Sequence, residues 1–453
     1  MNLSRMLERR AAEGRPVRAA LIGAGKFGTM FLAQARLTRG LQVLGIAELD
    51  PARARAACAA AGWPAEQAEA ADIDAALRDG STCLSDDAEA LIRHPATEVV
   101  IDATGHPPTG IRHCLMAIGH GKHVVMVNVE ADVVAGPLLA RKAAEAGVVY
   151  SLAWGDQPAL ICEHVDWART CGFQVVCAGK GTRYHPSYHQ LTPETVPDVL
   201  KQYLEIDPAS INLKMFNSFL DGTKSGIEMT AVCNATGLTP QDDGLGFPPA
   251  SRFELSEVCK PAAEGGTLTR SGTTEVVSSL HRDGSTVEHH LAMGTYVVIE
   301  GDTEYARRCF REYHMLADSS GRYAALYRPT HMIGLELGVS VASAACRGEP
   351  TGSPTGFRSD VVATAKRPLK KGEVLDGEGG FMVWGRQVPA ARSLELGGLP
   401  LGLASGVALA RDIAEGALVT WDDVKIDPND ETVRVRREME AAFARPNAGM
   451  AAD

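Results

Sequence analysis

A glycine-rich turn between a short apolar run and a helical segment constrains the fold of this chain more than any other feature. Val17–Ile22 is apolar, Gly-Ala-Gly-Lys-Phe-Gly follows at 23–28, and a helical pattern extends from Phe27 to Thr38. The same alternation continues to residue 150, with apolar runs at Leu41–Ala47, Val99–Ala103 and His123–Asn128 and helical patterns at Ala52–Ala61 and Ile111–Gly119. It predicts βαβ units, and therefore a doubly wound parallel sheet covered by helices on both faces.

The glycine turn predicts a dinucleotide site. Gly23 permits a tight turn, Gly25 lets the backbone approach a pyrophosphate, and Gly28 allows close packing of helix on strand. Lys26 and Phe27 open the helix, whose positive N-terminus attracts phosphates. The alternative is a structural turn without a ligand.

Acidic and polar residues at the ends of later strands extend this site. Glu48 closes the second strand, where its carboxylate would accept hydrogen bonds from ribose hydroxyls and repel a 2′-phosphate; this favours NAD over NADP. Arg53 and Arg55 keep NADP possible. Two further pairs follow strands and should line the same crevice, Thr104 and Gly105 beside the nicotinamide, and Asn128 and Glu130 as substrate contacts.

The pattern changes after residue 155, which predicts a second domain over 156–334. A stretch from Thr267 to Glu300 is rich in Thr, Val and Ser, which indicates a mixed or antiparallel sheet. The helical stretch Leu335–Ala345 could pack back on the first domain, 1–155. We expect the second domain to hold the catalytic residues and to form the floor of the substrate site.

A Gly/Pro/Ser/Thr cluster at 348–356 predicts a linker. Beyond it, AKRPLKKGEV (365–374) and ARDIAEGALV (410–419) are two related phrases, each with a basic residue, a turn glycine and a returning apolar pair. They indicate a small β-rich module over 358–428. The tail 445–453 is expected to be disordered.

Composition narrows the function. The formal net charge is −11, which disfavours a nucleic-acid surface. No apolar run reaches the ~20 residues of a membrane span. Leu3, Met6 and Leu7 form an apolar stripe among charges, which predicts a short amphipathic helix rather than a secretory signal. The ten cysteines contain no C-x-x-C pair. A cytoplasmic protein acting on a small molecule, with no nucleic-acid or membrane partner, is the expectation.

The residues resemble a known family. Gly23–Gly28, Asp102–Gly105 and Lys122–Asn128 resemble the NAD-binding Rossmann domain of homoserine dehydrogenases, and Cys177–Thr182 resembles the start of that family's catalytic domain. The paired C-terminal phrases resemble a SAF domain. Together they resemble SAF-domain-containing, homoserine dehydrogenase-like oxidoreductases, a group that includes 1-deoxyxylulose-5-phosphate reductoisomerase-like enzymes. The resemblance implies a Rossmann domain, an α+β catalytic domain, a SAF-like module, and a homodimer or homotetramer.

Two departures bear on the substrate. Homoserine dehydrogenases carry a lysine after the asparagine at 128, where this chain has Val129; homoserine is therefore not expected. The reductoisomerases hold a divalent metal with neighbouring carboxylates, whereas Asp156 stands here beside the neutral Gln157. A metal would need Glu130 or Glu228 as well, and its presence stays open.

Hydride transfer from an alcohol needs a group that removes the hydroxyl proton. Lys180 lies between Gly179 and Gly181, whose small size would let the backbone approach a ligand, and a desolvated lysine loses its proton more easily. Glu228 lies in an apolar helical stretch, so it needs a partner, either Lys180 or Lys224. The other candidates for the chemistry are Asp156, Asn234 and His331, and Arg328 could clamp a carboxylate or phosphate.

The sequence thus predicts an NAD(P)-dependent oxidoreductase acting on a small hydroxylated substrate that carries a carboxylate or phosphate. Lys180 would do acid–base work, Glu228 would set its charge state, and Arg328 would anchor the substrate. A reductoisomerase using NADPH and a divalent metal is one alternative. A non-catalytic sensor of sugar acids or nucleotides is another.

Overall fold

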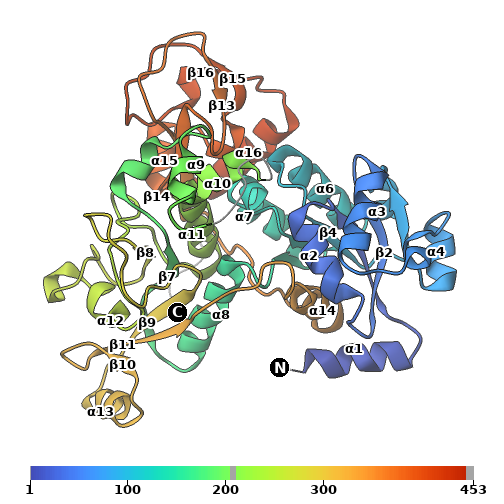
Figure 1. Ribbon diagram of the computed structural model, residues 1–453, viewed down its shortest axis with the longest axis horizontal. Helices are drawn as coiled ribbons and strands as arrows, with labels where there is room; N and C mark the ends of the chain where they lie inside the picture. Colours follow the sequence, from blue (N-terminus) through green and yellow to red (C-terminus); the bar gives the residue numbers. More distant parts are fainter. Residues whose placement is uncertain (1, 205–210, 445–453) are drawn as a thin grey trace. The chain divides into compact units, whose positions relative to one another are not determined.

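The computed structural model describes residues 2–204 and 211–444. The chain divides into two compact units (Figure 1). One comprises residues 1–160 and 331–355, and the other comprises 161–330 and 356–453. Each unit therefore contains two separate stretches of chain. The predicted disordered tail, 445–453, lies outside the described residues.

The first unit is a six-stranded parallel sheet in the order β3-β2-β1-β4-β5-β6. This is the doubly wound topology that the alternating pattern predicts. Its strands are β1 (Val17–Ile22), β2 (Leu41–Ala47), β3 (Cys83–Ser85), β4 (Val99–Asp102), β5 (His123–Met126) and β6 (Tyr150–Leu152). Its helices are α1 (Leu3–Ala12), α2 (Lys26–Ala35), α3 (Pro51–Ala60), α4 (Ile73–Asp79), α5 (Ala88–Arg93), α6 (Pro107–Gly119), α7 (Val129–Glu145) and α14 (Gly338–Arg347).

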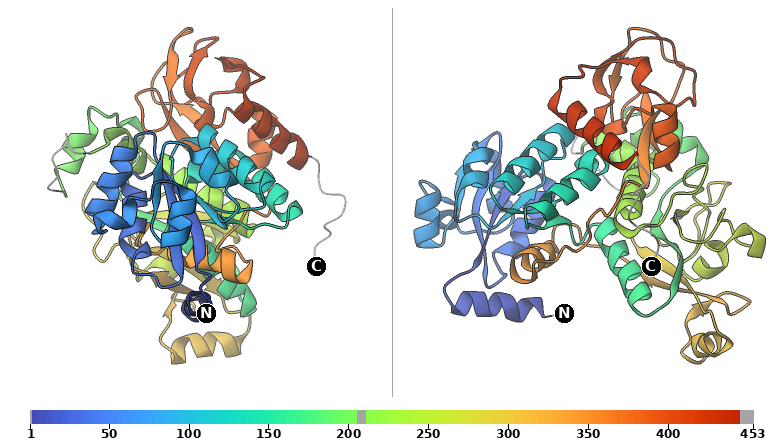
Figure 2. Two further views of the ribbon diagram at one scale, coloured as in Figure 1. Left: turned by 90° about the vertical axis from the view of Figure 1, so that its right-hand side faces the viewer. Right: turned by 180° about the vertical axis from the view of Figure 1, so that it is seen from behind.

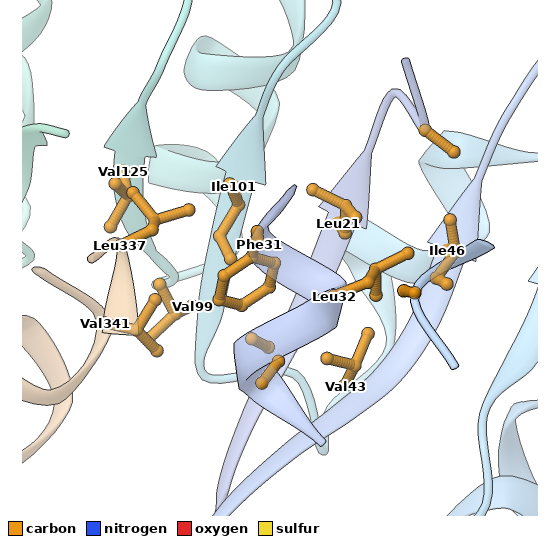
Figure 3. Close-up of a cluster of buried hydrophobic side chains, with 14 of the residues drawn as sticks. Leu21, Phe31, Leu32, Val43, Ile46, Val99, Ile101, Val125, Leu337 and Val341 are labelled. Atoms are coloured by element: carbon orange, nitrogen blue, oxygen red, sulfur yellow. The ribbon is translucent and has the colours of Figure 1, made fainter. Parts of the chain in front are cut away.

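Side chains from widely separated segments share the core of this unit. Figure 3 shows Phe31 of α2 and Val341 of α14 in one cluster with strand residues such as Val99. The amphipathic helix α1 adds Leu3 and Leu7 to the same cluster. The expected linker at 348–356 is partly tied to this unit, because the Gly352 carbonyl accepts a hydrogen bond from the Leu152 N–H at 2.7 Å.

The second unit is built on a five-stranded mixed sheet in the order β10-β11-β9-β7-β8, in which only β7 and β8 are parallel neighbours. Its strands are β7 (Gln174–Thr182), β8 (Thr273–Ser278), β9 (Thr295–Glu300), β10 (Leu316–Ala317) and β11 (Tyr323–Arg328). Its helices are α8 (Gln157–Thr170, whose first turn belongs to the first unit), α9 (Val196–Leu200), α10 (Leu213–Leu220), α11 (Thr223–Thr236), α12 (Leu255–Val258) and α13 (Glu304–Glu312).

Helices α8 and α11 cover one face of this sheet. Ile161 and Val165 of α8, and Met229 and Val232 of α11, pack in one cluster with strand residues including Val297. A second cluster fills the opposite face, where Leu255 of α12 packs. The sheet is therefore buried on both sides. The β-rich stretch predicted over 267–300 contains two of its strands, joined by an irregular connection.

The C-terminal module belongs to the second unit (Figure 2), where its strands β12 and β14 pack against α11. Its elements are β12 (Ser359–Ala365), β13 (Val374–Asp376), β14 (Val383–Pro389), α15 (Ala390–Leu396), β15 (Ser405–Leu409), β16 (Val424–Lys425) and α16 (Glu431–Phe443). The two related phrases pair with one another: the Leu369 and Ile413 backbones exchange two hydrogen bonds of 2.9 Å. The repeat seen in the sequence is thus a structural pairing.

Candidate functional site

The glycine turn after β1 has the geometry of a phosphate cradle. Gly23 has φ +97°, and a Cβ there would lie 2.6 Å from the Ala103 carbonyl oxygen. A Cβ at Gly28 would lie 2.5 Å from the Gly23 carbonyl oxygen, so both positions need glycine. Gly25 differs, because a Cβ there would meet no atom within 4 Å. Its backbone borders open space at the N-terminus of α2, where a pyrophosphate has room to bind.

Glu48 connects this turn to the end of β2. Its carboxylate accepts a hydrogen bond from the Ala24 N–H at 2.9 Å and one from the Leu49 N–H at 3.2 Å. Arg53 is one of the two arginines that leave NADP possible as the cofactor, and it lies 3.5 Å from the same carboxylate. A carboxylate and a guanidinium therefore lie side by side where β2 ends, next to the glycine turn.

A buried carboxylate organises the end of β4. Asp102 is 1% exposed and accepts hydrogen bonds from the Thr104 hydroxyl and from Nδ1 of His113, both at 2.8 Å. The Asn128 amide donates to the Thr104 hydroxyl at 3.2 Å, and its oxygen caps α7 by accepting from the Ala131 N–H. These bonds position Thr104 next to Gly105, which has φ +65°.

Substrate contact by Asn128 stays a prediction, and the structure gives this side chain a second role. The predicted strand ends at Met126, and Asn128 is the N-cap of α7 with an exposed fraction of 1%. Its polar atoms are used within the fold, so it acts by positioning Thr104. Glu130 lies in the first turn of the same helix and is partly buried.

In the second unit, Lys180 of β7 and Glu228 of α11 form a buried ion pair. The two residues are 5% and 4% exposed, and the lysine Nζ donates to the Glu228 carboxylate. The flanking glycines serve the sheet rather than a ligand. A Cβ at Gly179 would lie 1.8 Å from the Glu275 carbonyl oxygen, and one at Gly181 would lie 1.9 Å from that of Leu291.

The sheet register brings Lys180 into a row with two other polar residues. Thr295 of β9 pairs with Lys180 on one side and with Arg328 of β11 on the other. All three residues follow the alternation of Ala178, Val297 and Leu326, which pack on the face covered by α8 and α11. The row therefore sets an ammonium, a hydroxyl and a guanidinium side by side on one edge of a buried face.

His164 of α8 joins this row, and sequence reasoning missed it. Its Nε2 lies 3.0 Å from the Thr295 hydroxyl. Burial, and to a lesser extent the nearby Arg328 cation, together lower the pKa of the imidazole from 6.5 to about 4. His164 is therefore neutral near pH 7 and can either donate to or accept from the hydroxyl. A single histidine in an apolar helical segment has no sequence feature that indicates a functional role, and neither does Thr295.

The remaining predicted catalytic residues lie on other elements of the chain. Asn234 caps a connection instead: its oxygen accepts from the Arg358 and Ser359 N–H groups at 2.8 and 3.1 Å, which ties α11 to β12. Lys224 is partly buried in the first turn of α11, one turn before Glu228. Asp156 and His331 belong to the first unit, where the Asp156 carboxylate accepts from the Gln157 N–H at 2.9 Å.

Metal ligation finds no support in the part of the chain that the structure describes. Across residues 2–204 and 211–444, no three His, Cys, Asp or Glu side chains are grouped to hold a metal ion. Within the same ranges, no helix combines the length and apolar content needed to cross a membrane.

Three family models match separate parts of the chain. Residues 17–127 match the GFO/IDH/MocA oxidoreductase family, NAD-binding Rossmann fold. Residues 155–337 match the catalytic domain of oxidoreductase DRL, and residues 360–425 match the SAF domain. A search of curated proteins gives no significant match.

Solved structures show distant similarity. A probable dehydrogenase from Thermotoga maritima is 13% identical, with 74% of this chain and 90% of that one covered and a TM-score of 0.36. A putative oxidoreductase from Yersinia pestis is 14% identical, with coverage of 75% and 90% and a TM-score of 0.34. An Agrobacterium radiobacter oxidoreductase, solved with NAD⁺, L-tartaric acid and magnesium, is 16% identical; 37% of this chain covers 44% of its length, with a TM-score of 0.28.

The cradle and the family matches define the class: the chain is an NAD(P)-dependent oxidoreductase. More particularly, it is similar in three successive parts to the NAD-binding Rossmann fold of the GFO/IDH/MocA oxidoreductase family, to the DRL catalytic domain and to the SAF domain. The matched models name neither homoserine dehydrogenase nor a reductoisomerase.

Proposed function

We propose that the chain transfers a hydride between the nicotinamide and a small hydroxylated substrate that bears a carboxylate or a phosphate. The observation that carries this proposal is the row Lys180–Thr295–Arg328 on the helix-covered face of the second sheet. A proton-transfer group and an anion-binding group stand there at a spacing of two strands, about 10 Å. That spacing suits a substrate of a few carbon atoms held at one end.

In this proposal Lys180 moves the proton. When bound, the nicotinamide supplies the hydride acceptor or donor. In reduction, the Lys180 ammonium donates a proton to the carbonyl oxygen, where negative charge develops; in oxidation, the substrate hydroxyl passes its proton to Lys180 in the reverse of this step. The Glu228 carboxylate orients the Lys180 side chain by their hydrogen bond.

Arg328 holds the anionic end of the substrate, and its neighbours limit the orientation of its side chain. A guanidinium binds a carboxylate or phosphate through two parallel N–H bonds. The Arg328 Nε donates to the Thr330 carbonyl at 3.1 Å, which limits the orientations of the side chain. His164 and Thr295 lie between the two ends and can bond a further substrate hydroxyl.

A binding measurement and a turnover measurement test this function. NAD, NADH, NADP and NADPH are compared by thermal shift with and without Mg²⁺, since a ligand at 100 times its Kd stabilises the native state by about 2.7 kcal/mol. Hydroxy acids and polyol phosphates are then screened for turnover. We expect stabilisation by NAD(H) and oxidation of an anionic hydroxy compound; no response to any nucleotide would contradict the cofactor site.

A pair of variants separates catalysis from structural pairing. Lys180→Met leaves a buried carboxylate uncompensated, which costs several kcal/mol of stability, whereas Lys180→Met combined with Glu228→Gln removes both charges. We expect the double variant to regain stability but to lose turnover by at least about 10²-fold, with cofactor affinity within a few-fold of wild type. Lys370→Ala, which removes an exposed lysine also paired with an acid, is the control. Recovery of turnover in the double variant would assign the pair to structure alone.

A reductoisomerase that uses NADPH is a second candidate, and one observation favours it. Arg53 lies beside Glu48 and could pair with a 2′-phosphate. Stabilisation by NADPH, together with Mg²⁺-dependent turnover of 1-deoxyxylulose 5-phosphate, would favour this candidate. Assembly as a homodimer or homotetramer is likewise proposed, and light scattering of the full chain tests it.

A further inference from the structure

A cavity lies inside the second unit, away from the row of Lys180, Thr295 and Arg328. Its volume is about 180 Å³, and it is bounded by the first turns of α11, by the loop 243–247 and by β14 of the SAF module. Gly222 and Gly226 form the α11 wall, and Trp384 and Arg386 belong to the β14 wall. The residues of this cavity have no part in the proposed hydride transfer.

Rings from two stacked pairs form the apolar wall of the cavity, which His189, Trp384 and Phe247 line. The ring of His189 stacks on Trp384 with centroids 3.9 Å apart and planes 22° apart. Tyr184 stacks on Phe247 at the same separation, with planes 17° apart. Both pairs are joined, because the Tyr184 hydroxyl lies 2.9 Å from Nε2 of His189. The wall is therefore a preorganised aromatic surface.

The hydrogen bonds of His189 are already used. Its Nδ1 lies 2.7 Å from the Asp221 carbonyl oxygen, which can only accept, so Nδ1 carries the hydrogen and Nε2 accepts from Tyr184. Burial lowers the pKa of His189, in keeping with a neutral ring. A ligand in this cavity would meet the rings through apolar contact.

Arg386 supplies the charge. It donates one hydrogen bond to the Asp243 carbonyl at 2.8 Å, which fixes the side chain and leaves other guanidinium donors for an anion. Asp243 also lines the cavity, but its side chain is 91% exposed, so its carboxylate lies largely in solvent. The charge presented inward is therefore that of the guanidinium.

We propose that this cavity is a binding site for a small aromatic carboxylate, with its ring against Trp384 and Phe247 and its carboxylate on Arg386. The volume lies below the roughly 300–1,000 Å³ typical of pockets for drug-sized ligands, so it suits a single ring. Stacked rings favour a flat ligand, and a guanidinium favours a carboxylate.

The site is coupled to the helix that carries Glu228, a consequence that rests on the proposed function. The Gly385 N–H donates to the Thr223 hydroxyl at 2.8 Å, and a Cβ on Gly226 would lie 3.0 Å from the Gly385 carbonyl oxygen. Glu228 follows Gly226 by two residues. A ligand that shifts β14 against α11 therefore shifts the carboxylate that orients Lys180.

Binding of benzoate to the full chain, without cofactor or substrate, tests the site by calorimetry. We expect saturable binding that weakens at least about tenfold in Arg386→Gln, as the loss of a charge-assisted hydrogen bond requires, and weakens similarly in Trp384→Leu. Arg367→Gln, which alters an exposed arginine of the same module, should bind like wild type. Cyclohexanecarboxylate and benzyl alcohol, which lack the ring or the charge, should each bind more weakly.

The opposing outcomes are separable. The proposed site is overturned if wild type binds no benzoate at concentrations up to about 20 mM, where only a very weak affinity would be detected. It is also overturned if wild type and Arg386→Gln bind benzoate equally and their Tm values are the same. If benzoate binds through Arg386 but leaves kcat of wild type unchanged, the coupling to Glu228 is overturned while the site stands. If the wild type turns over no substrate, the proposed function fails, and the binding result is unaffected.

Discussion

The imidazole Nε2 of His164 lies 3.0 Å from the hydroxyl of Thr295. Thr295 is paired across the sheet with Lys180 on one side and with Arg328 on the other. This contact ties α8 to the row of polar side chains. The ring in this contact is uncharged near pH 7, since burial and the Arg328 cation both disfavour the imidazolium. Protonation of His164 should therefore disturb the fold and the site together.

Because burial keeps His164 neutral, the folded chain should lose stability as the pH falls below 6.5. Its pKa is about 4 in the folded chain against 6.5 ordinarily, so the unfolded chain binds the proton first as pH falls. The stabilisation is complete above pH 6.5 and is lost as pH falls towards 4. Between pH 7 and 4.5 the wild type should lose about 2 kcal/mol of unfolding free energy that His164→Gln retains. Denaturant titrations measure this, with His120→Gln as the exposed control; equal losses in wild type and His164→Gln would contradict it.

Replacing Arg328 should change both the affinity for substrate and the pKa of the neighbouring His164. Arg328→Gln should raise KM for an anionic substrate about 10- to 100-fold, since a charge-assisted bond contributes about 1.5–3 kcal/mol, with a smaller change in kcat. The pKa of His164 should also rise, because a nearby cation is removed; NMR titration reads this without any substrate. Arg322→Gln, which alters the residue immediately before β11, is the control. An unchanged KM would move the anion site elsewhere.

The buried carboxyl of Asp132 should make the chain less stable as pH rises from about 4 to above 7. The residue is 0% exposed, its Oδ1 accepts from the Tyr150 hydroxyl at 2.7 Å, and burial raises its pKa to about 7. The folded chain keeps this proton after the unfolded chain has lost it, so the stabilisation is full below about pH 4 and disappears as pH rises through 7.

Asp132→Asn removes this titration and retains an acceptor for Tyr150. The stability of the variant relative to wild type should improve by about 2 kcal/mol between pH 5.5 and 8.5. Asp79→Asn, at an exposed position of the same unit, should show no such trend. A pH-independent difference between wild type and Asp132→Asn would refute the assigned titration.

Glu48 predicts the choice of cofactor. Its carboxylate repels a 2′-phosphate while Arg53 stands 3.5 Å away. Glu48→Gln keeps an oxygen that can accept from the Ala24 N–H but removes the charge, so the ratio of NADP to NAD affinity should rise about tenfold, or about 1.4 kcal/mol. Fluorescence titration with NADH and NADPH measures the ratio, and Glu66→Gln serves as the surface control. A ratio that does not move would separate Glu48 from the ribose site.

Local pattern was sufficient for much of the first unit. The strand, glycine turn and helix at 17–35 follow from residues adjacent in sequence, and so does the acidic Glu48 at the end of its strand. The Lys180–Glu228 pair was predictable as one of two options, because a buried acid needs a cation. Thr295 and His164 were not, since their proximity to Lys180 depends on the order and register of strands far apart in sequence.

The glycines around Lys180 show a related difficulty. Flanking glycines suggested a ligand approaching the backbone, whereas Gly179 and Gly181 accommodate neighbouring backbone carbonyls within the protein. Composition alone does not distinguish these two causes of a small residue. Asn128 is similar, because its position after a strand is compatible with both substrate contact and helix capping.

The path of the chain through its two units sets an order for its assembly. Leu337 and Val341 fill the core of the Rossmann unit beside Val125, yet they are made about 200 residues later (Figure 3). During synthesis, the early strands and helices must therefore wait, with part of an apolar face uncovered, until the chain returns at 331–355. A nascent chain that stalls after β11 would present this face to chaperones, and only completion of α14 would bury it.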